Sequence, residues 1–386
     1  TTTGGADSII NKTEGANGVV VTGTVEPGST VVLRLGANAT VNATVDANGN
    51  WTATIPASQI PNVSVATAST LSVTATDQYG NVSTQSSSVT FDQSVRNFVE
   101  TNSARTAGDD MVNYNEAHAG FQITGTVEAG STVVVTLANG ATETVVAGSG
   151  GTWSVTFNAS DLPASEGTMT YTMVATDTAG NTALLNGTFD SDLVIPDAPD
   201  VTFYQATSGA VTGIGTNYTT ETFTITEITT SGGTENVTYR QTDDASYDES
   251  FFRFTNGSVP DGSYLVVTAA DDAGNSASTL VIANTSDVVN VDLDRAGLEG
   301  FDFASVDLTI APEASLTITE SQLISLTNSD NTLIINGGSD DHITALGAVN
   351  TGQTVEVDGV VHNVYTLGDD GATLLIDSSI THVTTI

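Results

Sequence analysis

The chain has no cysteine and only seven basic residues, and both scarcities exclude classes of protein. Without cysteine it can form neither disulfides nor thiolate metal sites. Because 45 acidic residues give a formal charge of -38, and Lys12 is the single lysine, a basic surface for nucleic acid is excluded. Carboxylates this dense repel one another and favour counter-ions, either from a saline medium or as a bound divalent cation. Calcium is the natural partner, because its ligands in proteins are oxygen atoms.

Long apolar runs and targeting signals are also lacking. No apolar run approaches the roughly 20 residues that a membrane-spanning helix needs, so we expect no membrane span. Thr1 opens no signal-peptide pattern, and we interpret the chain as mature or as a segment of a longer protein. With 37 Gly, only 8 Pro and abundant Val, Thr and Ile, the composition indicates folded β-structure with many turns.

An internal repeat is the clearest positive feature of the sequence. Thr22-Gly-Thr-Val-Glu-Pro-Gly-Ser-Thr-Val31 returns as Thr124-Gly-Thr-Val-Glu-Ala-Gly-Ser-Thr-Val133, 102 positions later. After the turn, the run from Val31 to Leu35 alternates apolar and polar positions with the period of a half-buried strand. The repeat therefore predicts a strand, a turn and a second strand in each copy.

Two further markers follow the repeat along the chain. Trp51 and Trp153 begin equivalent strands, so we predict core residues and not platforms for stacking sugars. An Asp-x-x-Gly-Asn turn occurs at 77–81, at 177–181 and again at 271–275. Three modules are therefore predicted, the third of them divergent.

The markers divide the chain into four predicted domains. Residues 1–92 and 93–193 are the two clear copies, 194–285 is the divergent copy, and 286–386 is an unrelated domain, small and either α+β or mostly β. In that last domain a capping box at Thr319–Gln322 predicts one short helix. We expect the extra residues 93–108 to supply an initial strand that the first copy lacks. The acidic insertion at 243–252 is either a ligand loop or ordinary sequence drift.

Together these signatures resemble the tandem bacterial Ig-like domains of large type I-secreted surface adhesins, the RTX and biofilm-associated proteins. The resemblance is strong over residues 1–193 and partial over 194–285. It implies a mainly β fold, with tandem Ig-like antiparallel β-sandwiches in an elongated array followed by the small C-terminal domain. It also implies a secreted, extracellular stalk segment at the cell surface, involved in adhesion or biofilm formation and rigidified by Ca2+ at the domain junctions. The Gly-Gly-x-Gly-x-Asp repeats of the fuller family pattern are missing.

Counting strands predicts where carboxylates gather. Alternate turns of an antiparallel sandwich lie at the same end, which groups the Glu128 and Asp177 turns of the second module, and Asp92 at the end of the first module should meet the Asp177 turn. By the same argument Asp190 or Asp192 should meet the Asp271 turn. The alternative is that Asp-x-x-Gly-Asn is only good turn chemistry. The candidate calcium ligands are Asp77, Asp92, Asp109, Asp110, Asp177, Asn181, Asp190, Asp192, Asp197, Asp271 and Asp272.

Other functions remain open at this stage. His342, His362 and His382 suggest zinc, although a spacing of twenty residues matches no structural period. No nucleophile elbow, phosphate loop or His-x-x-x-His site is present, so we predict no enzyme. The alternatives to a stalk are a self-assembling surface-layer or filament subunit and a carbohydrate-binding module in the C-terminal domain. The expected partners are calcium and, beyond it, cell-surface glycans, proteins or neighbouring copies.

Overall fold

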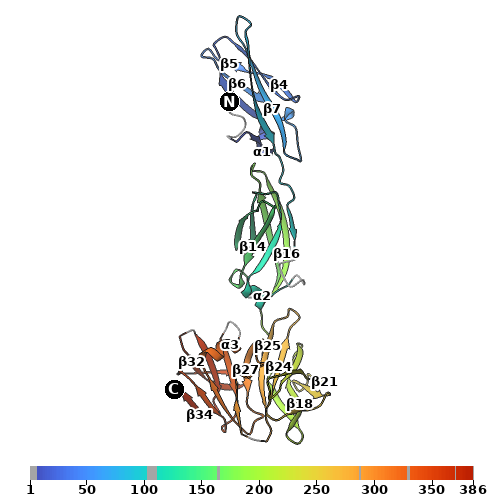
Figure 1. The fold of residues 1–386 in the computed structure, drawn as a ribbon, viewed down its shortest axis with the longest axis vertical. Coiled ribbons are helices and arrows are strands. Elements are labelled where there is room, and N and C mark those ends of the chain that lie inside the picture. The colour runs from blue at the N-terminus through green and yellow to red at the C-terminus, as the bar shows by residue number, and fades with distance from the viewer. Residues whose placement is uncertain are drawn as a thin grey trace. The chain divides into compact units, whose positions relative to one another are not determined.

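Strands dominate the structure, a computed structural model that describes residues 7–101, 111–162, 166–286, 288–327, 331–369 and 371–385 (Figure 1). They make up 56% of the chain against 7% for helices, which confirms the mainly β prediction. The chain separates into two compact units, Thr1–Leu193 and Val194–Ile386, and each is described by itself. Within the described ranges no helix has the length and apolar character to cross a bilayer.

The first module is a sandwich of two sheets, with strand orders β1-β8-β7-β3-β4 and β2-β6-β5. The predicted alternation is confirmed, because Val31, Leu33 and Leu35 are buried while Arg34 is exposed. Strands β2 and β3 lie in different sheets, so the repeated turn carries the chain from one layer to the other. The strands are β1 (Ile9–Ile10), β2 (Val19–Thr24), β3 (Thr30–Leu35), β4 (Ala39–Asn42), β5 (Thr44–Val45), β6 (Asn50–Ile55), β7 (Thr67–Thr76) and β8 (Val82–Phe91).

The second module repeats this plan and adds a strand. Its sheets have the orders β10-β16-β15-β12-β13 and β14-β11-β9. Strand β9 lies inside the extra segment and pairs antiparallel with β11, as the sequence predicts, while residues 102–108 of that segment lie outside the described residues. The strands are β9 (Val99–Thr101), β10 (Met111–Asn113), β11 (Phe121–Thr126), β12 (Thr132–Leu137), β13 (Thr142–Val146), β14 (Thr152–Phe157), β15 (Gly167–Thr176) and β16 (Thr182–Asp192).

Both tryptophans are core residues, as predicted. Trp51 is 5% exposed and Trp153 is 4% exposed, each between the two sheets of its module. In each strand the tryptophan is the first buried residue, and the following residues on the same face are also apolar and buried. The core of each module is therefore built around one indole ring.

Two short helices were not predicted from the sequence, which indicated only the helix after the capping box at Thr319–Gln322. Helices α1 (Lys12–Asn17) and α2 (Tyr114–Ala119) each begin after an asparagine that accepts a hydrogen bond from a glutamate amide three residues on. Six residues are too few to show a clear 3.6-residue apolar period. The predicted third helix is confirmed as α3 (Glu320–Leu326), with its capping box in place.

The second unit begins with another sandwich. Its sheets contain β17-β18-β22-β21, with β23 paired to β18, and β20-β19-β24-β25. The acidic insertion forms part of the β21–β22 hairpin. The strands are β17 (Val201–Ala206), β18 (Ala210–Asn217), β19 (Thr222–Ile228), β20 (Thr234–Asn236), β21 (Tyr239–Asp244), β22 (Glu249–Phe254), β23 (Val259–Pro260), β24 (Ser263–Ala270) and β25 (Ser276–Ala283).

After β25 the chain changes to parallel pairing. It alternates between two stacks, β25-β27-β29-β33 and β26-β28-β30-β34, and every neighbouring pair within them is parallel. The hairpin predicted around Asp358-Gly359 is confirmed as β31–β32, which extends the first stack. The strands are β26 (Val288–Val291), β27 (Phe303–Asp307), β28 (Glu313–Ile318), β29 (Thr332–Asn336), β30 (His342–Ala345), β31 (Ala348–Val357), β32 (Val360–Leu367), β33 (Ala372–Asp377) and β34 (His382–Thr385).

One nine-stranded sheet therefore crosses the predicted boundary at 285/286. Strand β25 belongs to the sandwich, and its parallel partner β27 belongs to the last hundred residues. A single apolar core follows the same path, from Ile228 and Tyr264 to Ile380. The boundaries of the four domains stay a prediction, but the last two regions share a sheet and a core.

Candidate functional site: carboxylates bound by Arg96

The site lies where the first module ends and the second begins, within the first unit. Asp92 follows the last residue of β8, and its amide donates to the carbonyl of Ile10 at 3.1 Å. Its side chain is almost buried, since the residue is 7% exposed. Four residues later the Arg96 guanidinium donates to Asp92 Oδ1 at 2.8 Å and to Oδ2 at 3.3 Å. This is a fork-shaped contact that lysine could not make.

Glu128 closes the other side of the guanidinium. It sits in the repeated turn after β11, and its Oε2 accepts a hydrogen bond from Arg96. The Arg96 backbone is held by the same residue, because its amide donates to Glu128 Oε1 at 2.8 Å and its carbonyl accepts from the Glu128 amide at 3.0 Å. The hydrogen bond with Asp92 raises the pKa of Arg96, as do the charges of Asp92, Glu128 and Asp177.

The Asp177 turn meets the same place, as the strand count predicts. Asp177 Oδ1 accepts from the amides of Ala179 and Asn181 at 2.9 and 2.8 Å, and Oδ2 accepts from Asn181 Nδ2 at 2.7 Å. Asn181 Nδ2 also donates to the Asp92 carbonyl at 2.9 Å. The turn is thereby bound to the end of the first module.

Helix α1 supplies the last contacts across this junction. Asn11 Nδ2 donates to the Ala179 carbonyl at 2.9 Å, and the Lys12 amide donates to Asn181 Oδ1 at 2.9 Å. Asn11 also caps α1 through its Oδ1. One side chain thus fixes the helix start and joins the two modules.

The carboxylates of this junction do not fit a calcium ion. Both oxygens of Asp92, Glu128 and Asp177 already accept N–H hydrogen bonds, four of the six from Arg96. Calcium needs six to eight oxygen ligands, and binding it here would require these oxygens to give up the N–H hydrogen bonds of Arg96 and of the Asp177 turn. Among the described residues, no group of three or more His, Cys, Asp or Glu side chains could hold a metal ion.

The other predicted ligands are not gathered at this junction. Asp77 holds its own turn through Asn81, and this hydrogen bond lowers the pKa of Asp77. Asp271 makes the same contacts with Asn275. Asp190 accepts from Thr168 Oγ1 at 2.6 Å. Asp109 and Asp110 lie outside the described residues. Whether Asp190, Asp192, Asp197, Asp271 and Asp272 form a second cluster stays a prediction.

A second group of carboxylates is buried in the second unit. Asp307 is 2% exposed and accepts from the amide and hydroxyl of Thr309 at 2.7 and 2.6 Å. Burial raises the pKa of Asp307 to about 6, and the charges of Asp200 and Asp341 contribute in the same direction. Burial also raises the pKa of Asp200 and of Asp341. Burial therefore disfavours the ionised form of all three groups.

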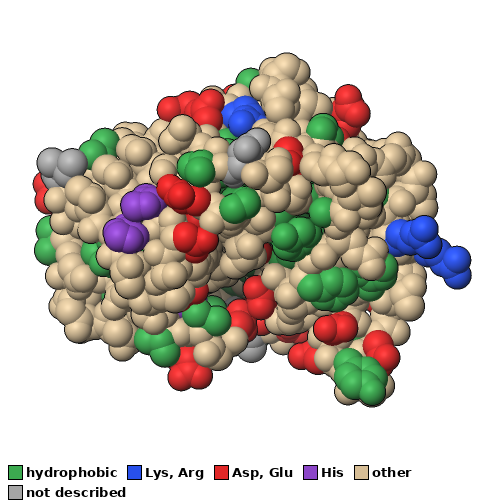
Figure 2. All heavy atoms as spheres, turned by 90° about the horizontal axis from the view of Figure 1, so that it is seen from below, with side chains coloured by type: hydrophobic (Ala, Val, Ile, Leu, Met, Phe, Trp, Pro, Cys, Tyr) green, Lys and Arg blue, Asp and Glu red, His purple; other side chains and the backbone are tan. Residues whose placement is uncertain are grey.

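The three histidines do not form one group. His342 and His382 are in register on neighbouring parallel strands, with ring centroids 4.5 Å apart, whereas His362 is buried on the other sheet and contacts Asn336 Oδ1 at 2.9 Å. Figure 2 shows two histidine side chains side by side among acidic ones. The parallel stack therefore brings together two of the three residues that the zinc hypothesis grouped.

Arg96 is the functional residue that sequence reasoning missed. Its signal was weak but present, since it is one of only seven basic residues and lies four positions after the predicted ligand Asp92. The strand count did place Glu128 at the same end as Asp177, although not as the partner of an arginine. Composition alone suggested an external cation where the chain supplies its own.

The fold and this junction define a class of protein in which Ig-like β-sandwiches follow one another in tandem. Residues 9–92 and 109–188 each match the family model described as "Bacterial Ig domain", so the chain contains two bacterial Ig domains. The comparison with curated proteins found no match.

Solved structures of bacterial adhesins are among those similar to this chain. One, described as a "Ca2+-stabilized adhesin" that helps an Antarctic bacterium "reach out and bind ice", is 29% identical over 71% of this chain and 70% of its own, with a TM-score of 0.40. Another, a "1.5-MDa bacterial ice-binding adhesin", is 26% identical over 71% and 92%, with a TM-score of 0.37. At these TM-scores the likeness carries no argument about function.

Proposed function

We propose that the chain is a structural stalk segment of an extracellular, cell-surface adhesin and has no catalytic role. The observation that carries this proposal is the directness of the first junction. Strand β8 ends at Phe91, Arg96 is already bound to both modules, and β9 of the next sandwich begins at Val99. Few residues join the two Ig domains, and Arg96 among them contacts both domains. A movement or force on one domain is therefore passed to the other. A free linker would not pass it on.

Calcium takes a narrower place in this proposal than the sequence suggested. At the first junction Arg96 supplies the positive charge, so we place no calcium there. Of the remaining predicted ligands, Asp190, Asp192 and Asp197 lie in sequence next to the proline-containing connection between the two units, and strand counting predicts that the turn at Asp271 and Asp272 meets them. With a formal charge of -38 in the chain, carboxylates at such a connection favour a divalent cation. We propose this connection as the calcium-dependent one.

The test separates a stalk from a binding domain. In the source cells, an antibody against this chain should label intact cells. In-frame deletion of residues 9–188 should reduce attachment while export continues. A stalk is needed for its length and stiffness, so replacing the deleted part with two unrelated Ig domains of the same length should restore attachment. Labelling only after lysis, or no recovery with the replacement, contradicts the proposal.

A further inference from the structure

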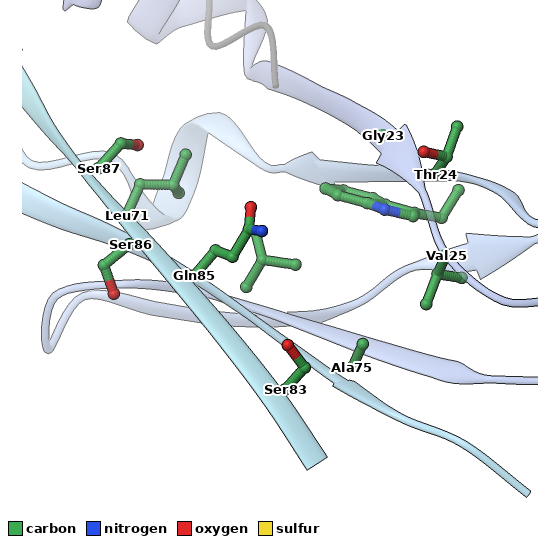
Figure 3. A pocket seen from close by; sticks show the side chains of 11 residues that line it. Gly23, Thr24, Val25, Leu71, Ala75, Ser83, Gln85, Ser86 and Ser87 are labelled. Carbon is green, nitrogen blue, oxygen red and sulfur yellow. The ribbon is translucent and has the colours of Figure 1, made fainter. Parts of the chain in front are cut away.

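The first module contains an open groove between its two sheets. A cavity of about 470 Å³ is lined on one side by Gly23 and Thr24 of β2, by Val25 after it and by Trp51. The opposite side is lined by β7 and β8, including Leu71 and Gln85 (Figure 3). Within the described residues, β2 pairs with β6 and is an edge strand of its sheet.

The same place in the second module is occupied by a strand. Glu100 of β9 is opposite Gly125 of β11, and its carboxylate accepts a hydrogen bond from Tyr171. The ring of Phe98 packs on Trp153 with centroids 6.3 Å apart. This strand approaches so closely that a Cβ on Gly125 would lie 2.3 Å from the Val99 carbonyl oxygen. For the equivalent Gly23, the three atoms nearest to an added Cβ all belong to the ring of Trp51.

The residues that line the groove differ between the copies in a consistent way. Leu71 and Val73 stand where the second module has Tyr171 and Met173, because both pairs occupy the same positions in the β7–β8 and β15–β16 ladders. Met173 is fully buried, whereas Val73 is only half-buried. The smaller side chains leave the space that a further strand would fill.

An acidic residue, Glu26, follows the groove-lining strand β2 in the first module. Glu26 occupies the position of Glu128 in the repeated turn, and Glu128 binds the arginine that precedes β9. Among the described residues the exposed Glu26 carboxylate has no hydrogen bond or ion pair. The first module thus has both parts of the receiving site, the edge strand and the acidic partner.

We propose that the first module binds an extended linker strand of the β9 type, carried by another module of the same repeat. Its backbone pairs with β2, its aromatic ring packs on Trp51, and its arginine binds Glu26. The inward acidic side chain of such a strand faces Gln85 and the serines of β8, which can donate hydrogen bonds where Tyr171 does in the second module. Sequence and cavity together specify the occupant, an Arg-x-Phe-Val-Glu-Thr segment.

The full chain offers a direct test. Asp109 of the second copy corresponds to Asp7, so a copy of residues 93–102 fused directly before Thr1 has the spacing found in the second module. Hydrogen exchange at the β2 amides should slow by at least about tenfold, and the melting temperature of the first module should rise by about 5 °C. In a W153F background, Trp51 emission should shift to shorter wavelength.

Two controls keep the outcome specific. An extension in which the copied Phe98 and Arg96 are serine should give little protection. The Glu26→Gln change should weaken the effect of the intact extension and leave the unextended chain unaltered. If the intact extension protects β2 no better than the serine version, the proposed acceptor site is wrong. This result would leave the stalk proposal untouched, because the first junction does not depend on it.

Discussion

Arg96 supplies, at the first junction, the positive charge for which the acidic composition of the chain suggested bound calcium. The side chains of Asp92 and Glu128 are 11% and 16% exposed, so their charges are costly to bury without a partner. A guanidinium fixed by its own backbone contacts to Glu128 loses little additional freedom on binding them. The positive charge here is therefore always present, whereas the occupancy of a calcium site depends on the medium.

Asp307 gives a pH-dependent prediction at the same scale. Its pKa is about 6 in the folded chain, above the usual value near 3.8. The folded state therefore binds the proton more tightly than the unfolded state. The stabilisation from this proton is complete below about pH 4 and is lost as the pH rises through about 6, a change of up to about 3 kcal/mol.

Asp307→Asn should remove most of this dependence. The amide oxygen can still accept from Thr309, so unfolding in urea should show a gain of up to about 3 kcal/mol at pH 7.5 and almost none at pH 4. Asp369→Asn, at an exposed position, is the matched control and should change neither value. Residual pH dependence from Asp200 and Asp341 should remain. An equal effect of Asp307→Asn at both pH values would show that its buried charge is not the cause.

At the scale of elements, β9 distinguishes the second Ig domain from the described part of the first. Replacing Val99, Glu100 and Thr101 by glycine should abolish this strand, because glycine removes both side-chain contacts and strand propensity. The second module should then resemble the first, with the groove beside Trp153 open. In a W51F background, acrylamide should quench Trp153 more strongly, and stability should fall by about 2–4 kcal/mol.

The control for this change is another edge strand. Glycine at Thr142, Glu143 and Thr144 removes exposed side chains from β13, the edge strand of the sheet that does not contain Trp153. It should lower stability without increasing the quenching of Trp153. If both triple variants expose Trp153 equally, the strand itself does not close the groove.

The sequence predicts elements well where a short pattern decides them. The alternation around Leu33, the β31–β32 hairpin and the cap of α3 are all local, and all three are confirmed. The parallel stacks of the second unit were not foreseen. A parallel strand such as β29 is not joined to its partner by a tight turn, so the sequence does not mark the partner, which lies tens of residues away.

Matching the two copies by sequence motif gives the wrong register at the end of β8, as the strand pairing shows. The sequence matches Phe91-Asp92 with Phe189-Asp190, but the strand registers place Phe91 at the position of Ser191. The structural counterpart of Asp92 is therefore Asp192. A two-residue shift keeps the same face of a strand, so the motif looks correct although its position is not.

At the scale of the whole molecule, the candidate site was predictable in part. Strand counting placed Asp92 beside the Asp177 turn, because the ends of an antiparallel sandwich are fixed by topology. It could not place Arg96, because the path of the segment between two domains follows no repeating pattern. The acidic composition then favoured calcium everywhere, while the structure provides an internal cation at one junction.

The central claim is that Arg96, and not calcium, fixes the first junction. The chain has no cysteine of its own, so cysteines introduced at the exposed positions Thr40 and Thr144 can carry the only two spin labels. The labels then report one distance across this junction. We predict the same narrow distance distribution with calcium and with chelator, a broad one for Arg96→Gln, and no change for Arg34→Gln on the exposed face of β3. A wild-type distance that broadens on chelation, or an Arg96→Gln chain that keeps the narrow distribution, would contradict the account.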